Sequence, residues 1–130
     1  MISGIAVAIR EMRPSARVYG VEPKHSNPMW EALRHQGPFA LSSLETIADG
    51  LAARITEDLN YSIVSQYVEE IVEATLYLLE HAKVLAEPSG AASLAGLLAN
   101  PKKKGKAVAV ISGGNVTLEQ IEALRRAPGI

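Results

Sequence analysis

The sequence contains no cysteine, which excludes disulfide scaffolds, cysteine-ligated zinc sites and thiol nucleophiles. Aromatic residues make up only 5% of the chain, although hydrophobic residues make up 48%. The core must therefore be built from alanine, valine, isoleucine and leucine. With 130 residues, the chain is expected to form a single domain, 1–130, which buries roughly two-thirds of its unfolded surface.

The chain also lacks a surplus of charge of either sign. It has 13 lysines and arginines against 14 aspartates and glutamates, a net charge of −1. This balance argues against a nucleic-acid-binding or anionic-membrane-binding protein, because both need a positive surface. No apolar run is long enough to span a membrane, and no signal peptide is recognisable. We therefore expect a cytoplasmic protein.

Apolar spacing and stop signals predict five or six helices and only two convincing strands. Pro14 ends the first helix, Asn27 or Ser26 caps the helix that begins at Pro28, and Ser89 caps a later one. A continuous apolar stripe predicts one long helix of about twenty residues. Helices are predicted over 5–12, 28–35, 62–85, 90–98 and 117–126, and strands over 17–21 and 107–111.

The second strand, Ala-Val-Ala-Val-Ile at 107–111, is apolar throughout, as is typical of a strand buried on both faces of a parallel sheet. A sheet of two strands is only marginally stable by itself. The first helix also has no strand before it, although alternation of strands and helices requires one. We infer an α/β fold with a partial three-layer sandwich, in which helices pack on a short parallel sheet. The chain is expected to be a piece of a larger protein.

Three loop segments contain residues suited to chemistry. The turn 112–115, Ser-Gly-Gly-Asn, follows the apolar strand and precedes a helix, which is where open α/β sheets bind ligands. Glu87, ahead of Pro-Ser-Gly, suits a general base or a substrate contact, and equally a charge at a helix end. Glu22 and His25 could share a cation or simply be solvated. Each segment alone also fits an ordinary structural turn.

Three segments of the sequence, taken together, are more specific than any one of them. Ala48-Asp49-Gly50, Glu87 to Ala91 (Glu-Pro-Ser-Gly-Ala) and 111–116 (Ile-Ser-Gly-Gly-Asn-Val) resemble, in order and spacing, the C-terminal part of threonine/serine dehydratases and serine racemases. These are enzymes of fold type II that use pyridoxal phosphate. The segment 18–23 (Val-Tyr-Gly-Val-Glu-Pro) is similar to a strand and loop of the same family. The resemblance extends over nearly the whole chain.

The resemblance implies roles for the residues of the turn. Ser112 matches the residue whose hydroxyl meets the pyridine nitrogen of the cofactor, and a neutral partner there suits elimination. Gly113, Gly114 and Asn115 complete that turn. Gly50 matches the backbone that lies along the cofactor near its 3-oxygen.

Two carboxylates also have family counterparts. Glu87 matches a carboxylate that faces the cofactor from the pocket wall. Glu22 matches an acidic ligand of the divalent cation found in some members. Pro28 stands near the place where those members have a second acid, which argues against a cation here.

Other parts of the family pattern have no counterpart in this sequence. The lysine that forms the Schiff base, the glycine-rich phosphate loop and the substrate-carboxylate loop all lie upstream in the family. Only a helix start at Ser3 and Gly4 is left to face a phosphate. A strand that the family has within the region matching 62–85 is expected to be deleted here, because the apolar stripe is unbroken.

The resemblance thus implies the C-terminal part of an ammonia-lyase that converts threonine or serine to a 2-keto acid, inactive alone. Its expected partners are the amino-acid substrate and either a homo-oligomer or a missing N-terminal half. Alternatives are a serine racemase, another fold type II enzyme, or a non-catalytic module that pairs with another chain.

Overall fold

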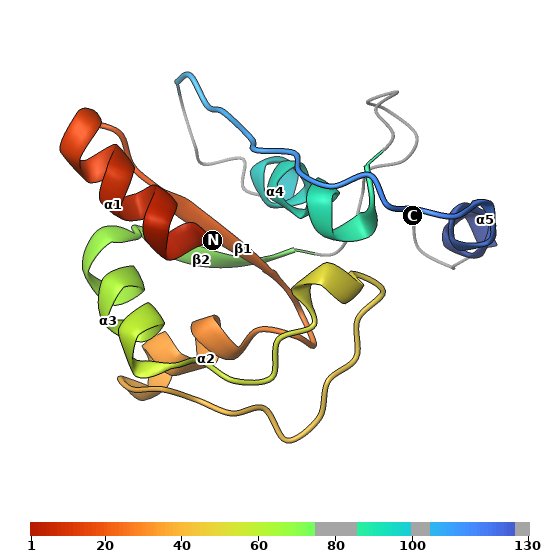
Figure 1. Cartoon of the computed structure of the whole chain (residues 1–130), viewed down its shortest axis with the longest axis horizontal. Coiled ribbons are helices and arrows are strands. Elements are labelled where there is room, and N and C mark those ends of the chain that lie inside the picture. The colour runs from red at the N-terminus through yellow and green to blue at the C-terminus, as the bar shows by residue number, and fades with distance from the viewer. Residues whose placement is uncertain (75–85, 100–104, 127–130) are drawn as a thin grey trace.

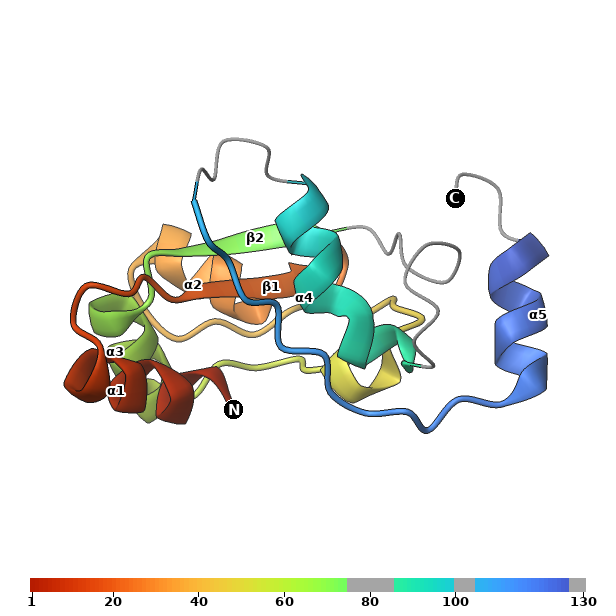
Figure 2. The same cartoon turned by 90° about the horizontal axis from the view of Figure 1, so that it is seen from above.

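A short parallel sheet with helices on both faces forms the centre of the molecule (Figures 1 and 2). The computed structural model describes residues 1–74, 86–99 and 105–126. Strand β1 (Tyr19–Pro23) pairs in parallel with β2 (Glu70–Ala74), and Gly20 is the partner of Ile71. The predicted class, helices packed on a short parallel sheet, is confirmed.

The two faces of β1 contact different helices. Gly96 of α4 (Pro88–Ala99) packs directly on the side chain of Val21. On the opposite face, the side chain of Ile71 covers Gly20, and Ile2 of α1 (Ile2–Met12) also reaches it. A side chain at Gly20 or Gly96 would displace these neighbours, so both glycines permit the close approach of the layers.

Helices α2 (Pro28–His35) and α3 (Asp58–Tyr67), with the short 3₁₀ helix η1 (Asp49–Leu51), connect the two strands. α3 packs against α1 and α2, whereas η1 packs against α4, near the end of β1 (Figure 1). The connection therefore places η1 next to the beginning of α4. The last helix, α5 (Leu118–Arg126), stands apart from the others in both views.

Several local signals predicted the elements correctly. α1 ends at Met12, two residues before Pro14, and α2 begins at Pro28. Thr117 and Gln120 form the reciprocal capping box at the start of α5: the Gln120 amide donates to Thr117 Oγ1 at 3.3 Å, and the Thr117 amide donates to Gln120 Oε1 at 2.9 Å. The first strand lies two residues further along the chain than predicted.

The prediction of one continuous helix over 62–85 is wrong. α3 ends at Tyr67, Val68 adopts an extended conformation, and β2 follows, so the strand is present rather than deleted. The Glu69 amide donates to the Val18 carbonyl at 2.8 Å, just ahead of the paired strands. Pairing with β1 thus outweighs the helical spacing of the apolar residues. The rest of the predicted helix, 75–85, lies outside the described residues.

The prediction of a strand over 107–111 is also wrong. The segment follows α4 as an unpaired trace (Figures 1 and 2). Val108 is 91% exposed and Val110 is 53% exposed. No neighbouring strand for it occurs among the described residues, and a strand forms only where its backbone groups are paired.

Candidate functional site

The segments that contain Gly50, Glu87 and the turn 112–115 meet at the beginning of α4. Gly50 of η1 lies against Ser89: a Cβ atom built on Gly50 would stand 2.9 Å from Ser89 Oγ and 3.7 Å from Glu87 Oε1. The turn 112–115 reaches the same helix end from the other direction. Residues separated by more than sixty positions thus surround one small region.

Gly90 is the point at which the turn touches α4. The Ser112 amide donates to the Gly90 carbonyl at 3.3 Å. A Cβ atom on Gly90 would overlap the Ser112 carbonyl and stand 3.1 Å from the Gly113 carbonyl oxygen. Only glycine therefore allows the two backbones to lie this close.

Glu87 holds the far side of the turn. Its Oε2 accepts a hydrogen bond from the Asn115 amide at 3.1 Å. Its Oε1 lies against Gly113, whose φ of +76° and lack of a side chain both suit glycine alone. The carboxylate therefore positions the turn through a backbone amide, whatever else it contacts.

Two hydroxyl groups of the site have no hydrogen-bond partner among the described residues. Ser112 is exposed, and its hydroxyl forms no hydrogen bond with the described residues. Ser89 Oγ is shielded from solvent and also has no partner. The sequence predicted that Ser89 caps the helix; in the structure Ser89 lies inside the first turn, and the Ala91 amide donates to the Glu87 carbonyl at 3.1 Å instead. An unpaired buried hydroxyl costs free energy unless a ligand pairs with it.

Ser3 and Gly4, the predicted phosphate contacts, lie at the start of α1. The Ser3 hydroxyl donates to Asn60 Oδ1 on α3 at 3.0 Å, and Ser3 is buried. Gly4 is exposed, with no atom within 4 Å of a Cβ built on it. What this helix end can offer an anion is therefore its backbone amides, because the hydroxyl already bonds to α3.

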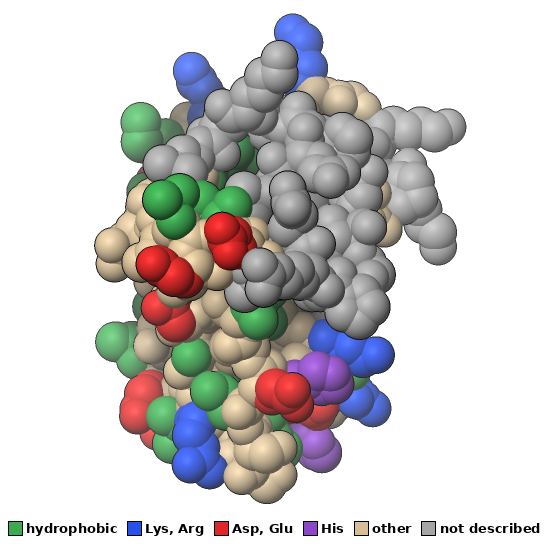
Figure 3. All heavy atoms as spheres, turned by 90° about the vertical axis from the view of Figure 1, so that its right-hand side faces the viewer, with side chains coloured by type: hydrophobic (Ala, Val, Ile, Leu, Met, Phe, Trp, Pro, Cys, Tyr) green, Lys and Arg blue, Asp and Glu red, His purple; other side chains and the backbone are tan. Residues whose placement is uncertain are grey.

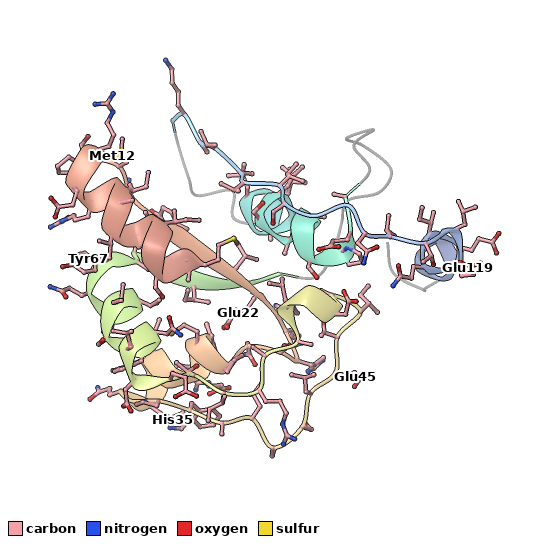
Figure 4. All side chains as sticks on the ribbon, in the orientation of Figure 1. Met12, Glu22, His35, Glu45, Tyr67 and Glu119 are labelled. Carbon is pink, nitrogen blue, oxygen red and sulfur yellow. The ribbon has the colours of Figure 1, made fainter. Side chains whose placement is uncertain are left out.

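Glu22, the predicted cation ligand, binds the beginning of α2 (Figure 4). Its Oε1 accepts from the Met29 amide at 3.1 Å and its Oε2 from the Trp30 amide at 2.9 Å. Asn27 occupies the N-cap position, as predicted, but its side chain makes no cap bond, and Ser26 donates to the Leu51 carbonyl at 2.8 Å. The side-chain cap of α2 therefore comes from Glu22. Within the described ranges, no three potential ligands of the His, Asp or Glu type are grouped together.

Sequence reasoning missed both the partner of Glu22 and the position of Ser89. Glu22 caps a helix that begins six residues later, so no short capping motif exists to recognise. The burial of Ser89 depends on Gly50, which is distant in sequence. Neither the cap formed by Glu22 nor the burial of Ser89 can be recognised from neighbouring residues in the sequence.

The chain belongs to the family of pyridoxal-phosphate dependent enzymes, whose pattern it matches over residues 1–113. It is 40% identical to the L-threonine ammonia-lyase of Thermotoga maritima over 133 residues, a match that covers 95% of this chain and 33% of that protein. This chain therefore spans about a third of the length of that relative.

Solved structures show the same fold. Threonine deaminase isoform 2 of Solanum lycopersicum has a TM-score of 0.87 at 24% identity, covering 99% of this chain and 41% of its own; at that identity the likeness establishes the fold alone. Maize serine racemase has a TM-score of 0.75 at 32% identity and covers 95% of this chain and 42% of its own. The resemblance stated from the motifs is thus confirmed. Among the described residues, no helix is long and apolar enough to cross a bilayer.

Proposed function

We propose that this chain forms one wall of the pyridoxal-phosphate site of an ammonia-lyase that acts on threonine or serine. The observation that carries the proposal is the meeting of Gly50, Glu87 and the turn 112–115 at the beginning of α4. Family membership and the likeness to an ammonia-lyase support the reaction class.

The residues present fit a flat, polar cofactor. Gly50 and Gly113 have no side chains that would fill the space beside the backbone, and the hydroxyls of Ser89 and Ser112 have no partner in the part of the chain that the structure describes. An aromatic ring with a nitrogen and a hydroxyl needs such a combination of bare backbone and single donors. The Glu87 carboxylate supplies a negative charge beside Gly113 and the turn.

Pyridoxal phosphate, when bound, withdraws electrons from the α-carbon of the amino acid, so that the α-proton and then the β-hydroxyl can leave. In our proposal the Ser112 hydroxyl would hold the ring nitrogen as a neutral partner. Gly50, which has no side chain, would leave room for the ring beside its backbone. Glu87 holds the turn and thereby fixes where the Ser112 hydroxyl lies.

We further propose that the chain needs additional polypeptide of the family to catalyse the reaction. The lysine that binds the cofactor in the family has no counterpart among the motifs of this sequence, and the chain spans only a third of its T. maritima relative. The additional polypeptide would supply the lysine, the phosphate loop and the contacts to the substrate carboxylate. A lysine in that role both anchors the cofactor and transfers the α-proton.

The test is co-expression of this chain with the part of the T. maritima ammonia-lyase that precedes the matched region. We expect the purified pair to retain pyridoxal phosphate, seen by its absorbance, and to release a 2-keto acid from threonine or serine. Appearance of D-serine in place of a 2-keto acid would identify a racemase instead. A pair that retains no cofactor would refute the proposal.

Substituted variants locate the site in the same assay. Ser112→Ala should lower turnover roughly tenfold, because one hydrogen bond to the ring is lost. Ser65→Ala, an exposed serine on α3, is the matched control and should leave turnover unchanged. Equal turnover of Ser112→Ala and Ser65→Ala would exclude the ring contact.

A further inference from the structure

Ser26, in the loop between β1 and α2, has a buried side chain that reaches a distant part of the chain. It is 1% exposed, whereas Lys24 and His25 just before it are exposed. Lysine, arginine and histidine side chains lie at the surface of the face shown in Figure 3. The Ser26 hydroxyl donates to the Leu51 carbonyl at 2.8 Å, and the Ala53 carbonyl lies 3.5 Å from it. The loop that follows β1 is therefore bonded to the end of η1.

The hydrogen bonds inside η1 are local. The Leu51 amide donates to the Ala48 carbonyl at 2.8 Å. The Gly50 amide donates to the side chain of Asp49, its own neighbour, at 2.8 Å. Such bonds fix the shape of a single turn but not its place in the molecule. The bond from Ser26, together with the packing of η1 on α4, sets that place.

The carbonyl that accepts this bond is next to Gly50, the residue of η1 that faces the candidate site. A Cβ atom on Gly50 would stand 2.9 Å from Ser89 Oγ and 3.7 Å from Glu87 Oε1. Because glycine has no side chain that could adjust, the position of its backbone alone determines how much space is left beside it. A displacement of Leu51 would therefore change that space directly.

A buried hydroxyl suits positioning better than it suits stability. The net contribution of a typical hydrogen bond to folding is modest, since the unfolded chain bonds to water instead. The bond is nevertheless directional, and 2.8 Å is close to the optimum for a hydroxyl donor and a carbonyl acceptor. The Glu45 amide also donates to the His25 carbonyl at 3.2 Å, so the long connection stays attached to the loop at a second point without the hydroxyl.

We propose that Ser26 is a positioning residue of the cofactor site: its hydroxyl holds η1, and with it the bare backbone of Gly50, where the ring would lie. This inference rests on the proposed function. If Ser26 only stabilised the fold, an equally damaging change elsewhere in the core would affect the cofactor to the same degree. Val64 provides such a place, because it is fully buried on α3, which packs against α1 and α2.

The test compares Ser26→Ala with Val64→Ala in the co-expressed pair described above. Both changes should lower the midpoint of urea unfolding of this chain, because each removes a buried contact. Titration of the pair with pyridoxal phosphate, followed by absorbance and by circular dichroism of the bound cofactor, measures affinity and the setting of the ring. We expect Ser26→Ala to weaken cofactor binding about tenfold and to alter the circular dichroism band, as loss of one hydrogen bond allows. Val64→Ala should change the affinity by less than about threefold and leave the band unaltered.

A second measurement uses this chain alone. The NMR signals of the amides of 49–52 should shift in Ser26→Ala and stay in place in Val64→Ala. If Ser26→Ala does not fold, Ser26→Cys replaces it in both experiments, since a thiol nearly keeps the volume and donates only weakly.

The outcomes separate this inference from the proposed function. Equal cofactor affinity in Ser26→Ala and Val64→Ala overturns the inference, even if the unaltered pair is an active lyase. Amide signals of 49–52 that do not shift in Ser26→Ala overturn it as well. An unaltered pair that binds no cofactor refutes the proposed function and this inference together, because no ring is then held beside Gly50.

Discussion

Replacing Gly90 by alanine sets two effects of opposite sign against each other. Alanine in place of a helical glycine favours the helix by about 0.5–1 kcal/mol. Against this, the new Cβ atom would overlap the Ser112 carbonyl, a backbone atom that cannot rotate away. Overpacking of this kind costs about 1–3 kcal/mol, and loss of the Ser112–Gly90 hydrogen bond costs about 0.5–1.5 kcal/mol more.

The cost exceeds the gain, so we expect the turn 112–115 to leave α4 in Gly90→Ala. Residues 112–115 are exposed and held to α4 by few bonds, so the rest of the fold should persist. The free energy of unfolding should therefore change by less than about 1 kcal/mol, because α4 keeps its gain in helix preference. The amide of Asn115, now bonded to Glu87, should lose its protection from hydrogen exchange.

Gly4 provides the matched control, because it is likewise the third residue of its helix and no atom lies within 4 Å of its Cβ position. Gly4→Ala should raise the free energy of unfolding by about 0.5–1 kcal/mol and leave Asn115 protected. Urea unfolding and amide exchange by NMR measure both quantities. If Gly90→Ala matches Gly4→Ala in both the free energy of unfolding and the protection of Asn115, the turn 112–115 does not lie as close to α4 as the structure shows.

Three further predictions concern single groups. Ser89→Ala should stabilise the chain by about 1 kcal/mol in urea, because it removes a shielded hydroxyl without a partner; destabilisation would mean that the hydroxyl is bonded. Glu22→Gln should lower stability by about 1 kcal/mol through the weaker cap on α2, whereas exposed Glu45→Gln should not. Hydrogen bonds from its own backbone amide and from Thr117 lower the pKa of Glu119, so its ionised form stabilises α5 above the ordinary carboxyl pKa. That contribution to the stability of α5 should be lost as the pH falls through the lowered pKa of Glu119. Amide exchange in α5 should then become faster, and the Glu119→Gln variant should not show this change.

The elements that could be predicted are those whose causes lie within a few residues. Pro14 and Pro28 limit helices because a ring fixes the backbone of one residue, and Thr117 with Gln120 makes a cap within one turn. The candidate site could be outlined from Glu87 and Ser112, since the order of their motifs in the sequence resembles a family. Its contacts could not, because Gly50, Ser89 and Gly113 come together only through the packing of η1 and the turn against α4.

The failure at β2 has a different origin. Ile71 and Val72 continue the spacing of the apolar stripe, and the same two residues are β-branched and favour strands. Local preference could not choose between the two structures. β1 decides, because its unpaired edge gains backbone hydrogen bonds only if 70–74 is extended.

The prediction of a strand at 107–111 failed for another reason: no described part of the chain pairs with that segment. The sequence Ala-Val-Ala-Val-Ile suits a strand only where apolar neighbours cover it on both sides. At β2 the required neighbour lies in the same chain, and the strand forms there. At 107–111 the segment is not assigned to a strand, and Val108 and Val110 are exposed. The same physical rule, that strands form where their backbone groups are paired, accounts for both results.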